Sequence, residues 1–72
     1  MAFVPRHLEE GAHVRLLQPA SNDAGTFNAG HEFMIIEVHA GDDGDVYDLR
    51  DRDLNLLFGV AAGEVEPFEP YW

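Results

Sequence analysis

The sequence contains no cysteine and no lysine, and its four basic residues are all arginine. The absence of cysteine excludes disulfide scaffolding, thiol catalysis and zinc sites built on thiolates. A small secreted domain usually needs such cross-links, so we expect a cytoplasmic location. Residues 1–11 carry no apolar run after a basic start and predict no secretory signal. The longest apolar run, residues 33–36, is too short to span a membrane.

Positive charge is scarce, because fourteen acidic residues outnumber the arginines and give a formal net charge of −10. The excess is uneven: residues 1–36 sum to −2 and residues 37–72 to −8. Nucleic acids and anionic membranes attract basic surfaces, so we expect this chain to bind neither directly. Three interpretations of the acidity stay open: an adaptation to solubility or salt, a basic or mixed protein partner, and mimicry of a nucleic acid.

A length of 72 residues predicts one domain spanning residues 1–72. Such a chain buries only about 60% of the surface that its unfolded form exposes. A deep substrate pocket with a lid has little room in a core of this size. We therefore expect a protein that is not an enzyme.

Short apolar segments alternate with turn residues along the chain, and no stretch keeps a helical apolar period, which predicts an all-β domain. The strand at residues 31–40 is the clearest, with Phe33, Ile35 and Glu37 on one face. Its other face is also apolar, which predicts a bent strand shared by two sheets. The expected strands are residues 12–18, 31–40, 46–51, 56–61 and 65–68.

The connections carry typical turn residues. Residues 20–29 predict a long loop in which Phe27 is the only large apolar side chain. Asp43-Gly44 predicts a tight hairpin, and Gly59 predicts a bulge or a sharp bend inside its strand. Residues 62–64 predict a 3₁₀ turn before the last strand.

Several strings in this layout resemble known small barrels. GAHVRLLQP looks like the opening strand of the barrels in a small accessory protein of photosystem I and in the nitrile hydratase β-chain. AGHEFMIIEVH, GDVYDLRD and LLFGVAAGEVEPF are similar to a bacterial family of short barrel proteins of unknown function. The resemblance covers residues 11–68 and implies an SH3-like small barrel of about five strands, with a 3₁₀ turn before the last one. It implies no catalysis, because the metal ligands of nitrile hydratase lie on its other chain.

The sequence departs from the SH3 domains that bind proline-rich peptides. Those domains line a groove with aromatic residues on the third strand and in the 3₁₀ turn. Here the third strand reads VYDLRD, and the turn contains Gly63 and Glu64. Binding of PxxP peptides is therefore not expected, and the resemblance transfers no function.

Histidine and carboxylate spacings predict no catalytic, cofactor or metal site. The spacings of His7, His13, His31 and His39 match no zinc motif. Residues 51–62 begin like a calcium loop, but Leu56 and Ala62 replace its required glycine and glutamate.

The second half of the chain combines its acidic residues with aromatic ones, which is typical of a surface that binds a basic protein. We expect Phe58 and Phe68 to belong to the core. The function expected from this pattern is a small acidic, non-enzymatic protein-interaction module, with an inhibitor, antitoxin or immunity protein as examples. The candidate contact residues are Asp42, Asp43, Asp45, Tyr47, Asp48, Asp51, Asp53, Tyr71 and Trp72.

Two other functions stay open. One is an accessory or structural subunit of a larger enzyme or phage assembly, and the other is a nucleic-acid mimic that blocks a DNA- or RNA-binding protein. In each case we expect a monomer or a weak homodimer, since a barrel this small leaves an edge strand open.

Overall fold

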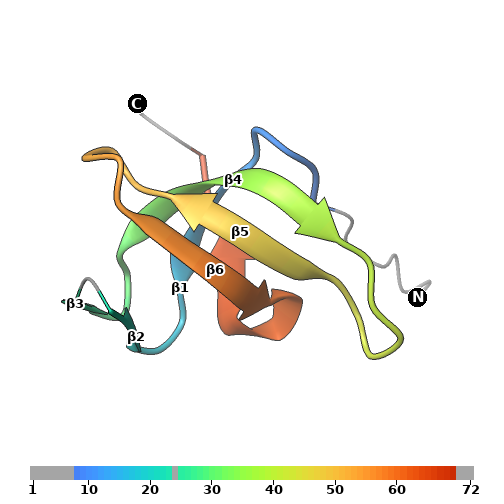
Figure 1. The fold of residues 1–72 in the computed structure, drawn as a ribbon. Helices are drawn as coiled ribbons and strands as arrows, with labels where there is room; N and C mark the ends of the chain where they lie inside the picture. Colours follow the sequence, from blue (N-terminus) through green and yellow to red (C-terminus); the bar gives the residue numbers. More distant parts are fainter. Residues whose placement is uncertain (1–7, 24, 70–72) are drawn as a thin grey trace.

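The computed structural model describes residues 8–23 and 25–69. These residues form seven strands in two sheets and one 3₁₀ turn, which confirms the expectation of an all-β fold (Figure 1). The strands are β1 (His13–Leu16), β2 (Ala20–Asn22), β3 (Gly25–Phe27), β4 (Glu32–His39), β5 (Val46–Arg50), β6 (Leu56–Ala61) and β7 (Val65–Pro67), and the 3₁₀ turn is η1 (Ala62–Glu64).

The larger sheet has five antiparallel strands in the order β6-β5-β4-β1-β7. β4, β5 and β6 follow one another as a meander, and β1 lies between β4 and β7 (Figure 1). These five strands and η1 fall where the apolar alternation and the turn residues predict them. β4 pairs with β1 from Glu32 to Met34 and with β5 from Met34 to His39. Both neighbours belong to one sheet, so the expectation of a strand shared by two sheets is wrong.

The expectation of one long loop over residues 20–29 is wrong. β2 and β3 form a two-stranded sheet of their own, in which Ala20 pairs with Phe27. Phe27 anchors this hairpin, because its ring is buried and packs edge-on against Phe33. Asn22 ties the hairpin to the larger sheet by donating a side-chain hydrogen bond of 2.7 Å to the Leu56 carbonyl.

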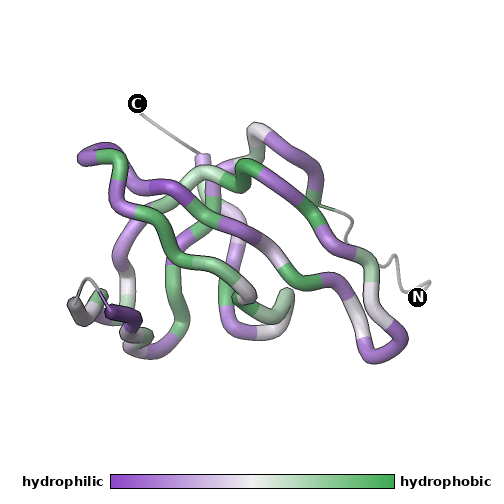
Figure 2. The backbone as a smooth tube through the Cα atoms, viewed as in Figure 1, coloured by the Kyte–Doolittle hydropathy of each residue, from purple (hydrophilic) through white to green (hydrophobic). Residues whose placement is uncertain are grey.

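The core collects the inward-facing residues of every strand of the larger sheet, together with Phe27. Apolar and polar residues alternate along β1, whereas β6 is apolar at every position except Gly59; Figure 2 colours the chain by the hydropathy of each residue. The buried side chains are Val14, Leu16, Phe27, Phe33, Ile35, Tyr47, Leu49, Leu57, Val60 and Val65. Burial of each large side chain contributes about 1.5–3 kcal/mol, so this set accounts for the cohesion of the sheet.

Two β-bulges interrupt the alternation on either side of β5. The pairing of β4 with β5 shifts between Ile35 and Glu37, and that of β6 with β5 shifts opposite Asp48. An extra residue reverses which face the following side chains occupy. Glu37 is therefore exposed rather than on the face of Phe33 and Ile35, where strict alternation places it.

Gly59 lies at the second bulge, as its sequence position predicts, with a φ of 73°. Only glycine adopts this conformation routinely. The bulge leaves Leu57 and Val60 both buried and Phe58, between them, exposed. The expectation that Phe58 belongs to the core is therefore wrong. Phe68 lies outside the core cluster as well and is half-buried against His13.

The described part of the chain holds no helix long and apolar enough to cross a membrane.

Candidate functional site

The candidate functional residues outside the core lie mainly on the outer face of β4, β5 and β6. On β5, Tyr47 and Leu49 point into the core, so Asp48 and Arg50 lie on the opposite face. The register places Asp48 directly opposite Glu37 of β4. The outer face thus brings together residues that are eleven positions apart in the sequence.

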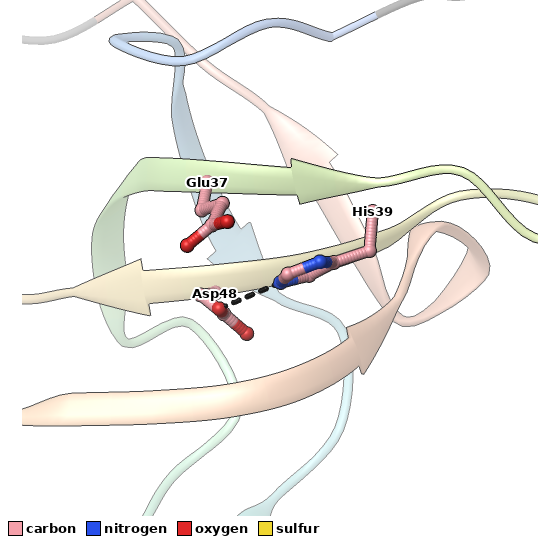
Figure 3. A group of neighbouring side chains, drawn as sticks. All are labelled: Glu37, His39 and Asp48. Carbon is pink, nitrogen blue, oxygen red and sulfur yellow. Dashed lines mark hydrogen bonds and ion pairs between the residues drawn. The ribbon is translucent and has the colours of Figure 1, made fainter.

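His39 and Asp48 form a close pair on this face (Figure 3). Nε2 of His39 lies 2.8 Å from Oδ2 of Asp48, and the His39 side chain is about half exposed. The hydrogen bond to Asp48 raises the pKa of His39 above its ordinary value, because the carboxylate stabilises the imidazolium form. The same bond lowers the pKa of Asp48, and the Gly59 backbone N–H lowers it further.

The bulge in β6 holds the Asp48 carboxylate from its other side. The backbone N–H of Gly59 donates a hydrogen bond of 3.2 Å to Oδ1 of Asp48. In a regular strand pair, backbone N–H groups bond to backbone carbonyls of the neighbouring strand and not to a side chain. The bulge therefore orients Asp48 toward His39.

Exposed apolar side chains concentrate beside these polar groups. Among the described residues, three of the four large exposed apolar side chains lie within residues 54–58: Leu54, Leu56 and Phe58. Phe58 is the more exposed of the two on β6, with 62% of its surface accessible. Leu56 lies on the same face, opposite Arg50 of β5. Leu56 and Phe58 belong to the edge strand β6, and Leu54 belongs to the loop before it; these three side chains are the apolar strip.

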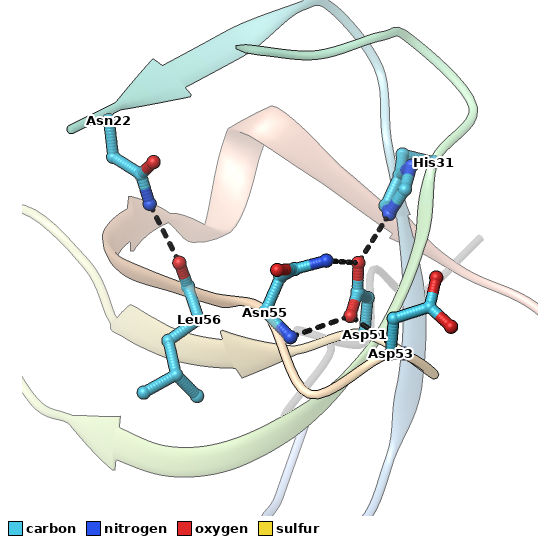
Figure 4. A network of polar contacts seen from close by, with 6 residues as sticks. All are labelled: Asn22, His31, Asp51, Asp53, Asn55 and Leu56. Atoms are coloured by element: carbon cyan, nitrogen blue, oxygen red, sulfur yellow. Dashed lines mark hydrogen bonds and ion pairs between the residues drawn. The ribbon is translucent and has the colours of Figure 1, made fainter. Parts of the chain in front are cut away.

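A second His–Asp pair lies in the loop between β5 and β6 (Figure 4). Asp51 is the only charged side chain that is buried among the described residues. Its Oδ1 accepts the backbone N–H groups of Asp53 and Asn55, at 2.9 and 2.8 Å. Its Oδ2 lies 3.0 Å from both the Asn55 side-chain amide and Nε2 of His31.

These contacts make Asp51 a structural residue of the loop. Burial raises its pKa, but the bonds from Asn55, His31 and Asp53 outweigh burial, so the pKa of Asp51 is lowered overall. The expectation that Asp51 is a contact for a partner does not fit this arrangement, because its carboxylate is enclosed.

The other predicted contact residues are divided by the structure. Tyr47 is 1% exposed and belongs to the core, so its ring is not available to a partner. Asp42 and Asp43 are exposed in the turn after β4, while Asp53 is exposed in the next loop and Asp45 and Asp48 are half-buried. Tyr71 and Trp72 lie outside the described residues.

Two shallow depressions accompany these features. One lies beside the Asp51 loop and is lined by residues 30–32 and 51–53. The other lies between Leu8 and Val38 and is lined by Glu9, Glu10 and Asp45. The first shares its polar groups with the loop network, whose donors already occupy Asp51.

Comparison of the chain with protein-family models, with curated proteins and with solved structures finds no match.

Sequence reasoning missed Glu37, His39 and Phe58 as residues of this face. Glu37 and His39 are two residues apart, which strand alternation places on one face, so that part of the signal was available. The pairing with Asp48 depends on the bulge in β4, which the sequence does not mark. The position of Phe58 depends on the bulge at Gly59.

Proposed function

We propose that this chain is a small acidic, non-enzymatic protein-interaction module with an SH3-like barrel fold. The fold proposal is supported by the strand order β6-β5-β4-β1-β7, with the first strand pairing with the last, and by η1 before the last strand. The hairpin of β2 and β3 occupies the connection between the first two strands of the larger sheet.

The observation that carries the function is the strip of exposed apolar side chains at residues 54–58. Leaving a large side chain in water forgoes about 1.5–3 kcal/mol of burial free energy. A domain with so small a core benefits little from an exposed phenylalanine, whereas aromatic side chains dominate the energetics of protein interfaces. The strip is therefore best explained as a contact for another protein.

The chemistry of the surroundings favours a basic partner. Glu37 and Asp48 lie on the same face as Phe58, and the chain as a whole carries a net charge of −10. Opposite charges across an interface accelerate association and select the partner. Arg50 on the same face adds one positive charge, so the expected partner surface is basic with some acidic groups, around an apolar pocket.

The other two functions receive less support. An accessory or structural subunit makes the same use of the apolar strip and stays a prediction. Nucleic-acid mimicry requires carboxylates spaced like phosphates along one face. The acids are divided among the turn after β4, the outer face, the enclosed Asp51 and the β1–β7 side, where Glu66 pairs with Arg15 at 2.6 Å. This distribution does not favour mimicry.

The test is site-specific photo-crosslinking in an extract of the native host. A benzophenone amino acid is placed at position 58 in one sample and at position 17 in another. Leu17 is the matched control, because it is 51% exposed and lies outside the strip. We expect position 58 alone to capture a protein with a basic surface. The captured protein is then purified, and its affinity for the chain is measured directly.

In that reconstituted complex, Phe58→Ser is expected to raise the Kd about tenfold or more, as for an interface hot spot. Leu17→Ser is expected to leave it unchanged, and added salt should slow association. Crosslinks only between copies of this chain, or equal capture from both positions, would contradict the proposal.

A further inference from the structure

Glu37 and Asp48 form an unfavourable pair. They are direct cross-strand partners on the outer face of the sheet. Two carboxylates placed opposite each other in an antiparallel sheet repel and reduce stability. The exposed Glu37 side chain contributes nothing to the core, so packing gives no reason for an acid at this position. A positive group between the two carboxylates would remove the repulsion.

His39 adds a nitrogen ligand to the two carboxylates. One ligand atom from each of Glu37, His39 and Asp48 lies within 4.8 Å of the other two, and Figure 3 shows the three side chains on one face of the sheet. An imidazole nitrogen with two carboxylate oxygens is a ligand set of zinc and similar borderline metals. We propose that Glu37, His39 and Asp48 form a surface binding site for a divalent transition-metal ion, with Zn²⁺ as the ion of choice.

The three side chains must rotate to reach the spacing of a zinc site. Zinc holds nitrogen and oxygen ligands at about 2.0–2.2 Å in a tetrahedron, so neighbouring ligand atoms are about 3.3–3.6 Å apart. Glu37 and His39 are both exposed, so their side chains have room to rotate toward that spacing. The fourth position faces solvent and is open to water or to a ligand from another molecule. This inference does not depend on the proposed interaction with a protein.

The available lone pairs distinguish this cluster from the other His–Asp pair. A carboxylate accepts about four hydrogen bonds. Asp51 receives four, from the two backbone N–H groups, the Asn55 amide and His31, so its oxygens are saturated. Asp48 receives one bond from Gly59 and one from His39. It therefore keeps lone pairs for a metal, and the Gly59 bond orients it as an outer-shell partner does.

The ligand set also selects among metals. Ca²⁺ and Mg²⁺ prefer oxygen ligands in six or more positions, whereas imidazole suits zinc, copper and nickel. When the metal binds the imidazole nitrogen that faces Asp48, any proton on that nitrogen is released to solvent. We therefore expect Zn²⁺ to bind and Mg²⁺ and Ca²⁺ not to bind.

The test is isothermal titration calorimetry of the tag-free full chain with Zn²⁺ at neutral pH, in a buffer that does not coordinate metals. We expect saturable binding of one Zn²⁺ per chain, and none with Mg²⁺ or Ca²⁺. Co²⁺ serves as a spectroscopic probe of the coordination geometry. Long-range ¹H–¹⁵N spectra of the imidazole rings then identify which histidine responds to the metal.

The variants distinguish the proposed metal ligands from residues that do not bind the metal. Loss of even an outer-shell partner costs about 10- to 100-fold in metal affinity, so His39→Ala and Glu37→Gln are each expected to raise the Kd for Zn²⁺ by about tenfold or more. The controls are His7→Gln, His13→Gln and Asp53→Asn, which remove a histidine or a carboxylate elsewhere in the sequence and should leave the Kd unchanged.

Glu37→Gln provides a second readout that a purely structural role would not give. Without metal, this variant removes the repulsion with Asp48, so its midpoint of thermal unfolding should stay equal or rise. With Zn²⁺ present, its midpoint should rise less than that of the original chain. Binding that survives His39→Ala, a response confined to another histidine, or the absence of saturable binding would overturn the proposal.

Discussion

The molecule contains two His–Asp pairs with the same chemistry and almost the same distance, 3.0 Å for His31–Asp51 and 2.8 Å for His39–Asp48. In the first pair, the aspartate side chain is 3% exposed and belongs to a loop; in the second, it is 14% exposed and lies on a sheet. The first carboxylate is saturated with donors from its own loop, whereas the second keeps part of its capacity. The number of donors around a carboxylate, rather than its histidine partner, separates a structural residue from one that can bind a ligand.

The largest expected effect on stability concerns the His31–Asp51 pair. Asp51→Asn replaces an oxygen that faces the Asn55 amide and His31 with an amide group that donates. A buried polar group without a suitable partner costs about 1–3 kcal/mol, so we expect the free energy of unfolding to fall by about 2 kcal/mol. Denaturant unfolding followed by circular dichroism measures it. The matched control is Asp53→Asn, an exposed neighbour that should change stability by less than about 0.5 kcal/mol. Equal effects of both variants would remove the structural role of Asp51.

The next largest effect on stability concerns the bulge at Gly59, which supports the His39–Asp48 pair. Gly59 has a φ of 73°, and a Cβ there meets no atom within 4 Å, so conformation rather than space restricts this position. Gly59→Ala should therefore destabilise the chain by about 1–2 kcal/mol.

Gly63→Ala is the control for this bulge, because Gly63 also has open space but no positive φ. We expect it to be neutral or slightly stabilising. Thermal unfolding of the two variants side by side measures the difference. If the two alanine variants unfold alike, the bulge does not depend on glycine.

A smaller effect follows from the lowered pKa of Asp51. A carboxyl group whose pKa is lower in the folded state than its ordinary 3.8 stabilises the fold above that value. The contribution disappears as the pH falls through the lower folded value. Urea unfolding across this acidic range should show a weaker loss of stability for Asp51→Asn than for the original chain. Parallel pH dependence in both proteins would argue against the lowered pKa.

The smallest effect on stability is expected from the His39–Asp48 pair. The pKa of His39 is raised above 6.5, so its bond to Asp48 stabilises the fold below that pH and is lost as the pH rises through the folded value. An NMR titration of the His39 ring should give a midpoint above 6.5, and Asp48→Asn should return it toward 6.5. A midpoint that ignores Asp48→Asn would show that the pair does not form in solution.

The all-β class, the five strands of the larger sheet and η1 follow from the sequence because alternation, glycine and proline act locally. The β2–β3 hairpin does not, because its strands are short and polar, and it depends on Phe27 and Asn22 contacting distant residues. Tyr47 shows a different limit. Its aromatic ring beside acidic residues resembles a contact, yet strand alternation already placed it beside Leu49 in the core.

The outer face was the least predictable part, since two single-residue bulges decide what it displays. Alternation alone places Glu37 on the face of Phe33 and Ile35, and places Phe58 on the face of the buried Val60. Only the register of β4 and β6 against β5 reveals that Glu37 meets Asp48 and that Phe58 is exposed.

The two bulges also separate the residues that pack the core from the residues that form the outer surface. Beyond each bulge the core takes up a valine, Val38 on one side and Val60 on the other. Residues 37, 39 and 58 therefore take no part in core packing. Substitutions at these positions should therefore leave the core packing unchanged, so the same scaffold is able to present different surfaces while its core stays constant.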